Sequence, residues 1–235
     1  MTNQTNIHWQ NDEELFAIIR EELYTAVVGD IMDQEGYVHQ FLPPQIQPLR
    51  DDIFLVGRAM TVLEADCFEN IPKKTYNPVF EKPFGLMLEA LDDLKENEVY
   101  ICTGASPTYA LWGELMATRA TKLGSNGAVV NGYSRDTHGI LAIDFPTFSY
   151  GRYAQDQAPR GKVIDYRVPI EIEGVRVNDG DIIIGDIDGV CVVQKEIEQT
   201  IFTKAIEKAR GEKVVQQAIL DGMSAKDAFD KYGIM

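Results

Sequence analysis

The sequence predicts an α/β protein that folds as one domain over residues 1–235 and ends in a helical tail. Two patterns support this prediction. Between residues 85 and 131, segments with helical spacing alternate with short apolar strands, as in parallel strands covered by helices. From residue 145 to 193, short strand-like segments follow one another through glycine-bearing turns, which favours antiparallel or barrel-like pairing.

The first predicted element is a helix that begins after Asn11, because apolar residues recur at helical spacing from Leu15 to Leu23. Asn11 and Glu14 have the spacing of a capping box. A second short helix is expected over residues 27–35, ending at a glycine, and a strand over residues 53–63. The proline-punctuated stretch 67–84 is expected to be irregular.

The remaining elements follow from the same rules of spacing and punctuation. Helices are expected over residues 85–94 and 111–123, and strands over 98–102, 127–131, 145–148, 163–172, 175–177, 181–185 and 189–193. The tail is expected to form helices over residues 196–211 and 212–221 and a last turn capped by Ser224.

The charge of the chain narrows its possible partners. It carries 22 Lys and Arg against 37 Asp and Glu, a formal net charge of −15. Nucleic acid and anionic membranes are bound mainly through clustered cations, so we expect neither as a partner. No secretory signal or membrane span is recognised, and the three cysteines, Cys67, Cys102 and Cys191, are far apart. These features predict a cytoplasmic protein with reduced thiols.

The sequence lacks the motifs of several common binding and catalytic sites. No glycine-rich phosphate loop, nucleophile elbow or paired-histidine metal motif is present. The segment 186–189 resembles a fragment of a calcium loop, but the other ligand positions are missing, which favours a turn between two strands.

One constellation of residues remains. Gly113, Glu114, Leu115 and Met116 open the predicted helix, and the first turn of a helix offers free backbone N–H groups to a carboxylate or phosphate. About twenty residues later, the predicted strand 127–131 leads into Arg135 and Asp136.

Those side chains have complementary chemistry. Arg135 can clamp a carboxylate or enolate, and Asp136 offers hard oxygen ligands to Mg²⁺ or Mn²⁺. Glu114 suits a site beside an anion when a cation lies between them. The set is typical of a small oxo acid bound through a divalent metal. The alternative is a solvated Arg-Asp turn and a favourable acid in a first helical turn.

Ordered motifs along the chain resemble those of the RraA-like family, which includes 4-hydroxy-4-methyl-2-oxoglutarate aldolases and regulators of ribonuclease activity. The family signature is a glycine, then Arg-Asp some twenty residues later, then an acid after two more residues. Gly113 with Arg135 and Asp136 matches its first parts. Further matches fall at residues 25–30, 57–62, 127–132, 145–148 and 180–190, within a family core of about residues 23–195.

The resemblance implies a three-layer β/β/α swivelling-domain fold and assembly into homotrimers or homohexamers with sites between subunits. In aldolase members, a divalent metal and pyruvate bind together. By motif position, Asp136 would ligate the metal and Glu114 would act on it through water. Arg135 would contact the pyruvate oxygen, and the amides of Leu115 and Met116 would hold its carboxylate. Glu212, in the tail helices 196–235, is the candidate for a carboxylate from a neighbouring subunit.

The resemblance therefore implies a lyase that releases a pyruvate enolate, with aldolase and oxaloacetate decarboxylase activity. One position departs from the signature: Gly139 stands where the acid is expected, with His138 and Asp144 as the nearest substitutes. This departure keeps two alternatives open. One is a non-catalytic regulatory or binding protein, similar to the ribonuclease-inhibiting members. The other is a lyase or isomerase for a different sugar-derived acid, with residues 67–85 shaping its pocket.

Overall fold

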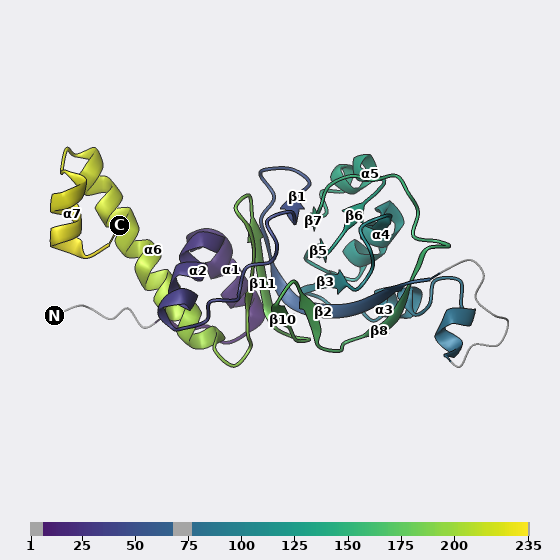
Figure 1. The fold of residues 1–235 in the computed structure, drawn as a ribbon. Helices are drawn as coiled ribbons and strands as arrows, with labels where there is room; N and C mark the ends of the chain where they lie inside the picture. The colour runs from purple at the N-terminus through teal and green to yellow at the C-terminus, as the bar shows by residue number, and fades with distance from the viewer. Residues whose placement is uncertain (1–6, 68–76, 235) are drawn as a thin grey trace.

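The computed structural model describes residues 7–67 and 77–234 and is built around one eight-stranded mixed sheet (Figure 1). Seven of its strands run in the order β1-β7-β5-β3-β2-β11-β12, and β8 pairs with β2 beside them. Their bounds are β1 (Gln47–Pro48), β2 (Leu55–Asp66), β3 (Glu98–Thr103), β5 (Gly127–Val130), β7 (Thr147–Ser149), β8 (Gly161–Tyr166), β11 (Ile182–Asp186) and β12 (Gly189–Val193).

Strand β2 is the centre of this sheet. One edge of it pairs in parallel with β3. Along its other edge, Leu55–Arg58 pair antiparallel with β11 and Val62–Asp66 pair antiparallel with β8. The register with β8 shifts between Leu63 and Glu64, which marks a bulge. Most side chains of β2 are buried because both faces of the sheet are covered: Val56 belongs to one core cluster, and Ala59, Met60 and Val62 belong to another.

Helices cover the sheet from two sides (Figure 1). On one side, α1 (Asp12–Glu22), α2 (Thr25–Gln34) and α6 (Glu198–Leu220) share a core cluster with apolar side chains of β11 and β12. On the other side lie α3 (Met87–Asp92), α4 (Glu114–Lys122) and α5 (Thr137–Ala142), whose buried side chains belong to a second cluster. A short helical turn, η1 (Pro78–Glu81), precedes α3.

The carboxy-terminal tail differs in one respect from its prediction. Helix α6 runs without interruption through Gly211, where two separate helices were expected, so that prediction is wrong. A Cβ atom on Gly211 would lie 2.6 Å from Cδ1 of Ile234, so the glycine makes room for the end of the chain rather than breaking the helix. The final helix α7 (Ala225–Tyr232) is capped by the Ser224 side chain, as predicted.

The α/β class and the helical tail are confirmed. The Asn11 side chain accepts a hydrogen bond from the N–H of Glu14 and caps α1. The Glu14 carboxylate accepts from the N–H of Gln10, one residue before the position that a capping box predicts. The three cysteines are free and buried. Among the described residues, no helix has the length and apolar character needed to cross a membrane.

Short segments account for the other differences. The expected helix 111–123 begins as a strand, β4 (Ala110–Trp112), which pairs with β6 (Tyr133–Ser134) in a separate two-stranded sheet. The expected strand 163–172 is divided into β8 and β9 (Ile170–Ile172), and β9 forms a hairpin with β10 (Val175–Val177). Half of the stretch 67–84 that was expected to be irregular, residues 68–76, lies outside the described residues.

Candidate active site between α4 and α5

The parallel pair of β4 and β6 brings the two predicted site segments together. Ala110 is paired with Tyr133 and Trp112 with Ser134. The backbone N–H of Arg135 continues this pairing by donating to the carbonyl of Trp112 at 2.8 Å. Since Gly113 directly follows Trp112, the start of α4 lies beside Arg135 and Asp136. The sequence could not establish this proximity, because it depends on pairing between distant segments.

Gly113 allows a close approach between these segments. A Cβ atom at this position would lie 2.8 Å from Oδ2 of Asp136 and 3.4 Å from Cγ of Arg135. Asp136 itself has a left-handed backbone, with φ of 54°, and precedes α5. Such a conformation is uncommon outside glycine, although aspartate tolerates it better than most residues. The left-handed residue turns the chain from β6 into α5 and leaves the Asp136 carboxylate against the start of α4.

The first turn of α4 is open to a ligand. Gly113 is its N-cap residue, and it has no side chain to satisfy the amides of the first turn. Leu115 in that turn is 83% exposed. The amides of Leu115 and Met116, which the resemblance assigns to a carboxylate, therefore lie at an uncapped helix end, where the helix dipole also favours an anion.

Glu114 lies against Gly139 on α5. A Cβ atom on Gly139 would lie 2.1 Å from Cδ and 2.2 Å from Oε2 of Glu114. The space in which a side chain at position 139 would begin is thus filled by the Glu114 carboxylate. The acid expected at position 139 is absent, and another carboxylate of the same site stands in its place.

A cavity of about 230 Å³ adjoins these residues. Its polar lining comes from Arg135, Asp136, Asp156 and Gln157, and its apolar lining includes Phe84, Met87, Trp112, Leu115 and Met116. Arg135 is partly exposed there: its Nη1 lies 2.8 Å from Oδ1 of Asp156, and its Nε donates to Oδ1 of Asp136 at 3.4 Å. A cation flanked by two carboxylates beside an uncapped helix end can receive one small anion and orient it.

The donors present fit one kind of metal site. Among residues 7–67 and 77–234, no group of three or more His, Cys, Asp or Glu side chains is placed to hold a metal ion. Asp136 lies against Gly113 and Glu114 lies against Gly139, so two carboxylates stand near the start of α4. Magnesium commonly binds through one or two carboxylates and keeps several waters. The site therefore fits a hydrated Mg²⁺ or Mn²⁺ and does not fit an ion enclosed by protein ligands alone.

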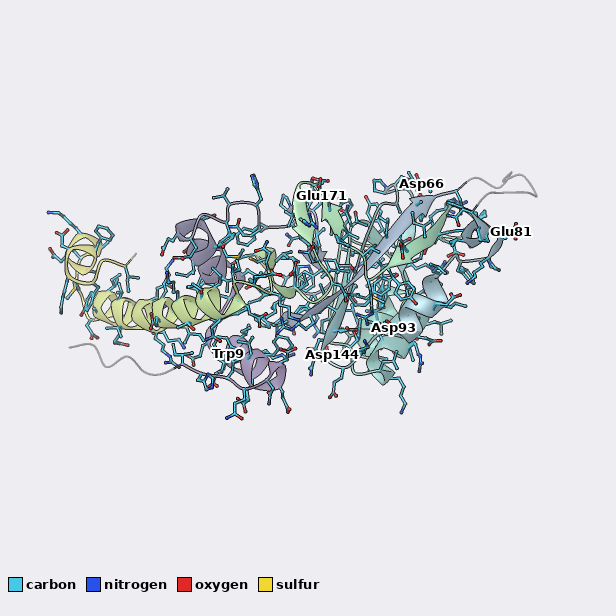
Figure 2. The ribbon with its side chains drawn as sticks, turned by 90° about the horizontal axis from the view of Figure 1, so that it is seen from below. Trp9, Asp66, Glu81, Asp93, Asp144 and Glu171 are labelled. Atoms are coloured by element: carbon cyan, nitrogen blue, oxygen red, sulfur yellow. The ribbon has the colours of Figure 1, made fainter. Side chains whose placement is uncertain are left out.

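The other predicted residues lie apart from this centre. Asp144 is 2.8 Å from the guanidinium of Arg50 and lies on another side of the molecule from Asp66 (Figure 2). His138 is exposed and does not line the cavity. Glu212 is on α6, across the sheet from α4 and α5 (Figure 1). Within one chain, the structure therefore does not bring Glu212 to the site.

Glu212 has partners of its own on α2 and α6. It accepts a hydrogen bond from the Tyr24 hydroxyl, and its Oε1 lies 3.5 Å from Nζ of Lys208. Burial, together with the Glu212 carboxylate, raises the pKa of Tyr24 to about 12, so this hydroxyl keeps its proton. The role of Glu212 as a metal ligand in an assembly remains a prediction.

Sequence reasoning missed two groups at the cavity. Asp156 and Gln157 lie in the connection between β7 and β8, where no periodicity or motif marks them. Behind Gln157 lies Glu64, whose side chain is buried in β2. The only sign of Glu64 in the sequence is an acid at the end of an apolar strand, and the sequence pattern predicts that such an acid is exposed.

Comparison with known proteins places the chain among relatives. The family model described as RraA-like: Aldolase/RraA matches residues 25–192. A Halalkalibacterium halodurans protein named "Putative 4-hydroxy-4-methyl-2-oxoglutarate aldolase" is 30% identical over 206 residues, which are 87% of this chain and 89% of that protein. Protein DlpA of Legionella pneumophila is 26% identical over 208 residues, which are 88% of this chain and only 32% of that protein. The chain thus spans about a third of the length of DlpA.

A solved structure shows the same fold. The crystal structure of Streptomyces coelicolor RraAS2, described as an unusual member of the RNase ES inhibitor RraA protein family, superposes with a TM-score of 0.74. The two sequences are 19% identical, and the match covers 89% of this chain and 99% of the other. The predicted fold and the predicted family are both confirmed: this chain belongs to the RraA-like family.

Proposed function

We propose that this chain is a divalent-metal-dependent lyase that cleaves a small 2-oxo acid and releases pyruvate. The observation that carries the proposal is the convergence of Arg135, Asp136 and the uncapped start of α4 on one cavity, with Glu114 in the first turn of that helix against Gly139. The aldolase name of the Halalkalibacterium halodurans relative supports the same reaction class. The substrates to test first are 4-hydroxy-4-methyl-2-oxoglutarate and oxaloacetate.

Each residue has a role in this chemistry. The amides of Leu115 and Met116 would hold the substrate carboxylate at the helix end. The Arg135 guanidinium would stabilise the negative charge that develops on the 2-oxo oxygen as the carbon–carbon bond breaks. Asp136 would hold the divalent ion directly and Glu114 would act through water. A bound Mg²⁺ or Mn²⁺ supplies Lewis-acid polarisation of the 2-oxo group. The electrons of the broken bond remain on the pyruvate fragment, which is then protonated.

The assay is release of pyruvate from 4-hydroxy-4-methyl-2-oxoglutarate, or of CO₂ from oxaloacetate, with Mg²⁺ or Mn²⁺ and again with EDTA. We expect activity only with the metal. Arg135→Ala should lower kcat/KM by about 100-fold, because one charge-stabilising donor contributes on that order. The matched control is Arg119→Ala on the exposed face of α4, where Arg119 pairs with Asp92 at 2.7 Å. Activity that survives EDTA, or full activity of Arg135→Ala, would reject the proposal.

The proposed assembly is a homotrimer or homohexamer in which Glu212 of one copy meets Asp136 of the next. Sedimentation of the protein and Mg²⁺ calorimetry on Glu212→Gln test this part. Weaker Mg²⁺ binding in an unchanged assembly supports the role of Glu212 at the shared site. Unchanged Mg²⁺ binding contradicts it. Loss of the assembly itself would instead assign Glu212 to subunit contact through Tyr24 and Lys208.

A second candidate is a non-catalytic regulatory or binding protein, because the description of the RraAS2 structure names an RNase ES inhibitor family. It is motivated by Gly139, which cannot ligate a metal or orient water. This candidate predicts no binding of Mg²⁺ with oxalate and a stable protein partner in a pull-down. The two candidates therefore give opposite results in one calorimetric titration.

A further inference from the structure

Glu64 is a buried carboxyl group beside the cavity. Its residue is 2% exposed. Its Oε2 accepts a hydrogen bond of 2.6 Å from the side-chain amide Nε2 of Gln157, whereas its Oε1 is buried and has no hydrogen-bond partner in the described part of the chain. Burial raises the pKa of Glu64 from 4.5 to about 8. An ionised carboxylate without a cation is costly in such a place, so the acid stays protonated near neutral pH.

The titratable groups around Glu64 do not offset this burial. Tyr100 and Cys102 face it from β3, and burial raises the pKa of both well above their usual values. Tyr109, after the loop that follows β3, also has a raised pKa and donates to Asp66 at the end of β2 (Figure 2). Within residues 7–67 and 77–234, Glu64 has no ion pair with Lys, Arg or His. Glu64 is therefore the group of this cluster that changes protonation near neutral pH.

Gln157 connects Glu64 to the cavity. It lines the cavity beside Asp156 and Arg135 while its Nε2 donates to Glu64. An amide has a donor end and an acceptor end, so directing Nε2 at Glu64 leaves the amide oxygen for the cavity. An ionised Glu64 can only accept, and it enforces this orientation. A protonated Glu64 can still accept from Nε2, as in the structure, but it can also donate its O–H to the amide oxygen, and this second pairing turns the NH₂ group towards the cavity.

We propose that Glu64 is a positioning residue whose protonation selects whether Gln157 offers its amide oxygen or its amide nitrogen to the ligand. The choice of ligand rests on the proposed function, and the coupling between the two residues does not. A 2-oxo acid is an anion and accepts hydrogen bonds, so it prefers the NH₂ orientation. An ionised Glu64 also places a negative charge behind Gln157, which lines the cavity. Both effects weaken anion binding as Glu64 loses its proton.

The coupling is tested in the full-length protein without ligand. The infrared C=O stretch of a protonated carboxyl group is followed from pH 6 to pH 9.5 in wild type, Glu64→Gln and Gln157→Leu. We expect a band that titrates near pH 8 in wild type, is absent in Glu64→Gln and is shifted in Gln157→Leu. Glu171→Gln, an exposed carboxyl group on β9, is the control that keeps the band (Figure 2). A wild type without the band, or a band that ignores Gln157→Leu, overturns the inference.

The consequence for the ligand is tested by calorimetry of oxalate with Mg²⁺ between pH 6.5 and pH 9. If oxalate raises the pKa of Glu64 from about 8 by about one unit, its affinity falls about fivefold over this range in wild type. Glu64→Gln should reduce that change to less than about twofold by the same relation, and Gln157→Leu should reduce it in part, because the charge of Glu64 remains. An equal pH profile in wild type and Glu64→Gln, with only a lower Tm in the variant, would show a purely structural role and overturn the inference. If the infrared band behaves as expected and oxalate binds at no pH, the coupling stands and the proposed function fails.

Discussion

The Glu114 carboxylate occupies the space that a side chain at position 139 would need. The Cδ atom of Glu114 lies 2.1 Å from where a Cβ atom of residue 139 would be, closer than any two carbon atoms can approach without a bond. A carboxylate at position 114 in this conformation therefore excludes any side chain at position 139. The absence of the signature acid at position 139 and the position of the Glu114 carboxylate therefore depend on each other.

Restoring the acid should therefore harm the site. In Gly139→Asp the new side chain must displace Glu114, whose exposed carboxylate can move at little cost to the fold but then leaves its place in the site. We expect weaker binding of Mg²⁺ with oxalate and little change in Tm. Gly139→Ala separates the effect of the lost space from the effect of the new acid, because alanine should favour helix α5 by up to about 1 kcal/mol unless it clashes. Faster pyruvate release in Gly139→Asp would show that the acid, and not the space, limits the site.

Gly113→Ala tests the approach between α4 and Asp136. The added Cβ atom would lie 2.8 Å from Oδ2 of Asp136, so the carboxylate must move. We expect kcat/KM to fall at least about tenfold, since small misplacements at a reacting centre cost factors of this size or more. Thermal unfolding should change little because Asp136 is partly exposed. Lys122→Ala, at the far end of α4, is the control expected to keep activity.

Arg58 joins the helices to the sheet. On β2, its guanidinium donates to Asp12 of α1 and to Glu198 of α6, and its side chain is only 15% exposed. These contacts lower the pKa of Asp12. Arg58→Ala leaves two carboxylates facing each other, so we expect a loss of about 2–4 kcal/mol in the free energy of unfolding in urea. Arg119→Ala removes an exposed ion pair and should cost less than about 1 kcal/mol. Equal losses in the two variants would contradict the role of Arg58.

Glu64 should make stability depend on pH. Its pKa is raised from 4.5 to about 8 in the folded chain, so between these values the native state holds a proton that the unfolded chain has released. The free energy of unfolding then falls as pH rises through this interval, by up to about 1.4 kcal/mol per pH unit, and levels off above it. Urea unfolding of wild type and Glu64→Gln from pH 5 to pH 9 isolates the contribution. Parallel curves would show that Glu64 ionises normally.

Local signals allowed much of the fold to be predicted. The side chain of Asn11 caps α1, Ser224 caps α7, and the continuous apolar run 189–193 forms β12 with the predicted bounds. These features depend on neighbours in the sequence, where spacing and capping chemistry apply directly. Residues 113–116 were placed in the first turn of a predicted helix, and with them the open amides of the site, although that helix was expected to begin at residue 111 and α4 begins at Glu114.

What escaped prediction depends on contacts between distant segments. Strands β4 and β6 are two or three residues long and exist because they pair with each other, which no local pattern reveals. Glu64 is buried because it lies two residues after Val62 on the same face of β2, where Gln157 from a distant segment covers it. The filling of the space at Gly139 by Glu114 likewise required the packing of α4 against α5.

The layout of the site has a consequence for how such a protein can diverge. The groups assigned to bond cleavage come from two segments, residues 113–116 and 135–139, which the β4–β6 pair holds together. The far walls of the cavity come from elsewhere: Phe84 and Met87 precede them in the chain, and Asp156 and Gln157 follow them. Substitutions at Phe84 and Met87 can thus accumulate without disturbing the reacting groups, whereas Asp156 is paired with Arg135 and is less free to change. Descendants of one ancestor can accept different acids while keeping the same chemical step.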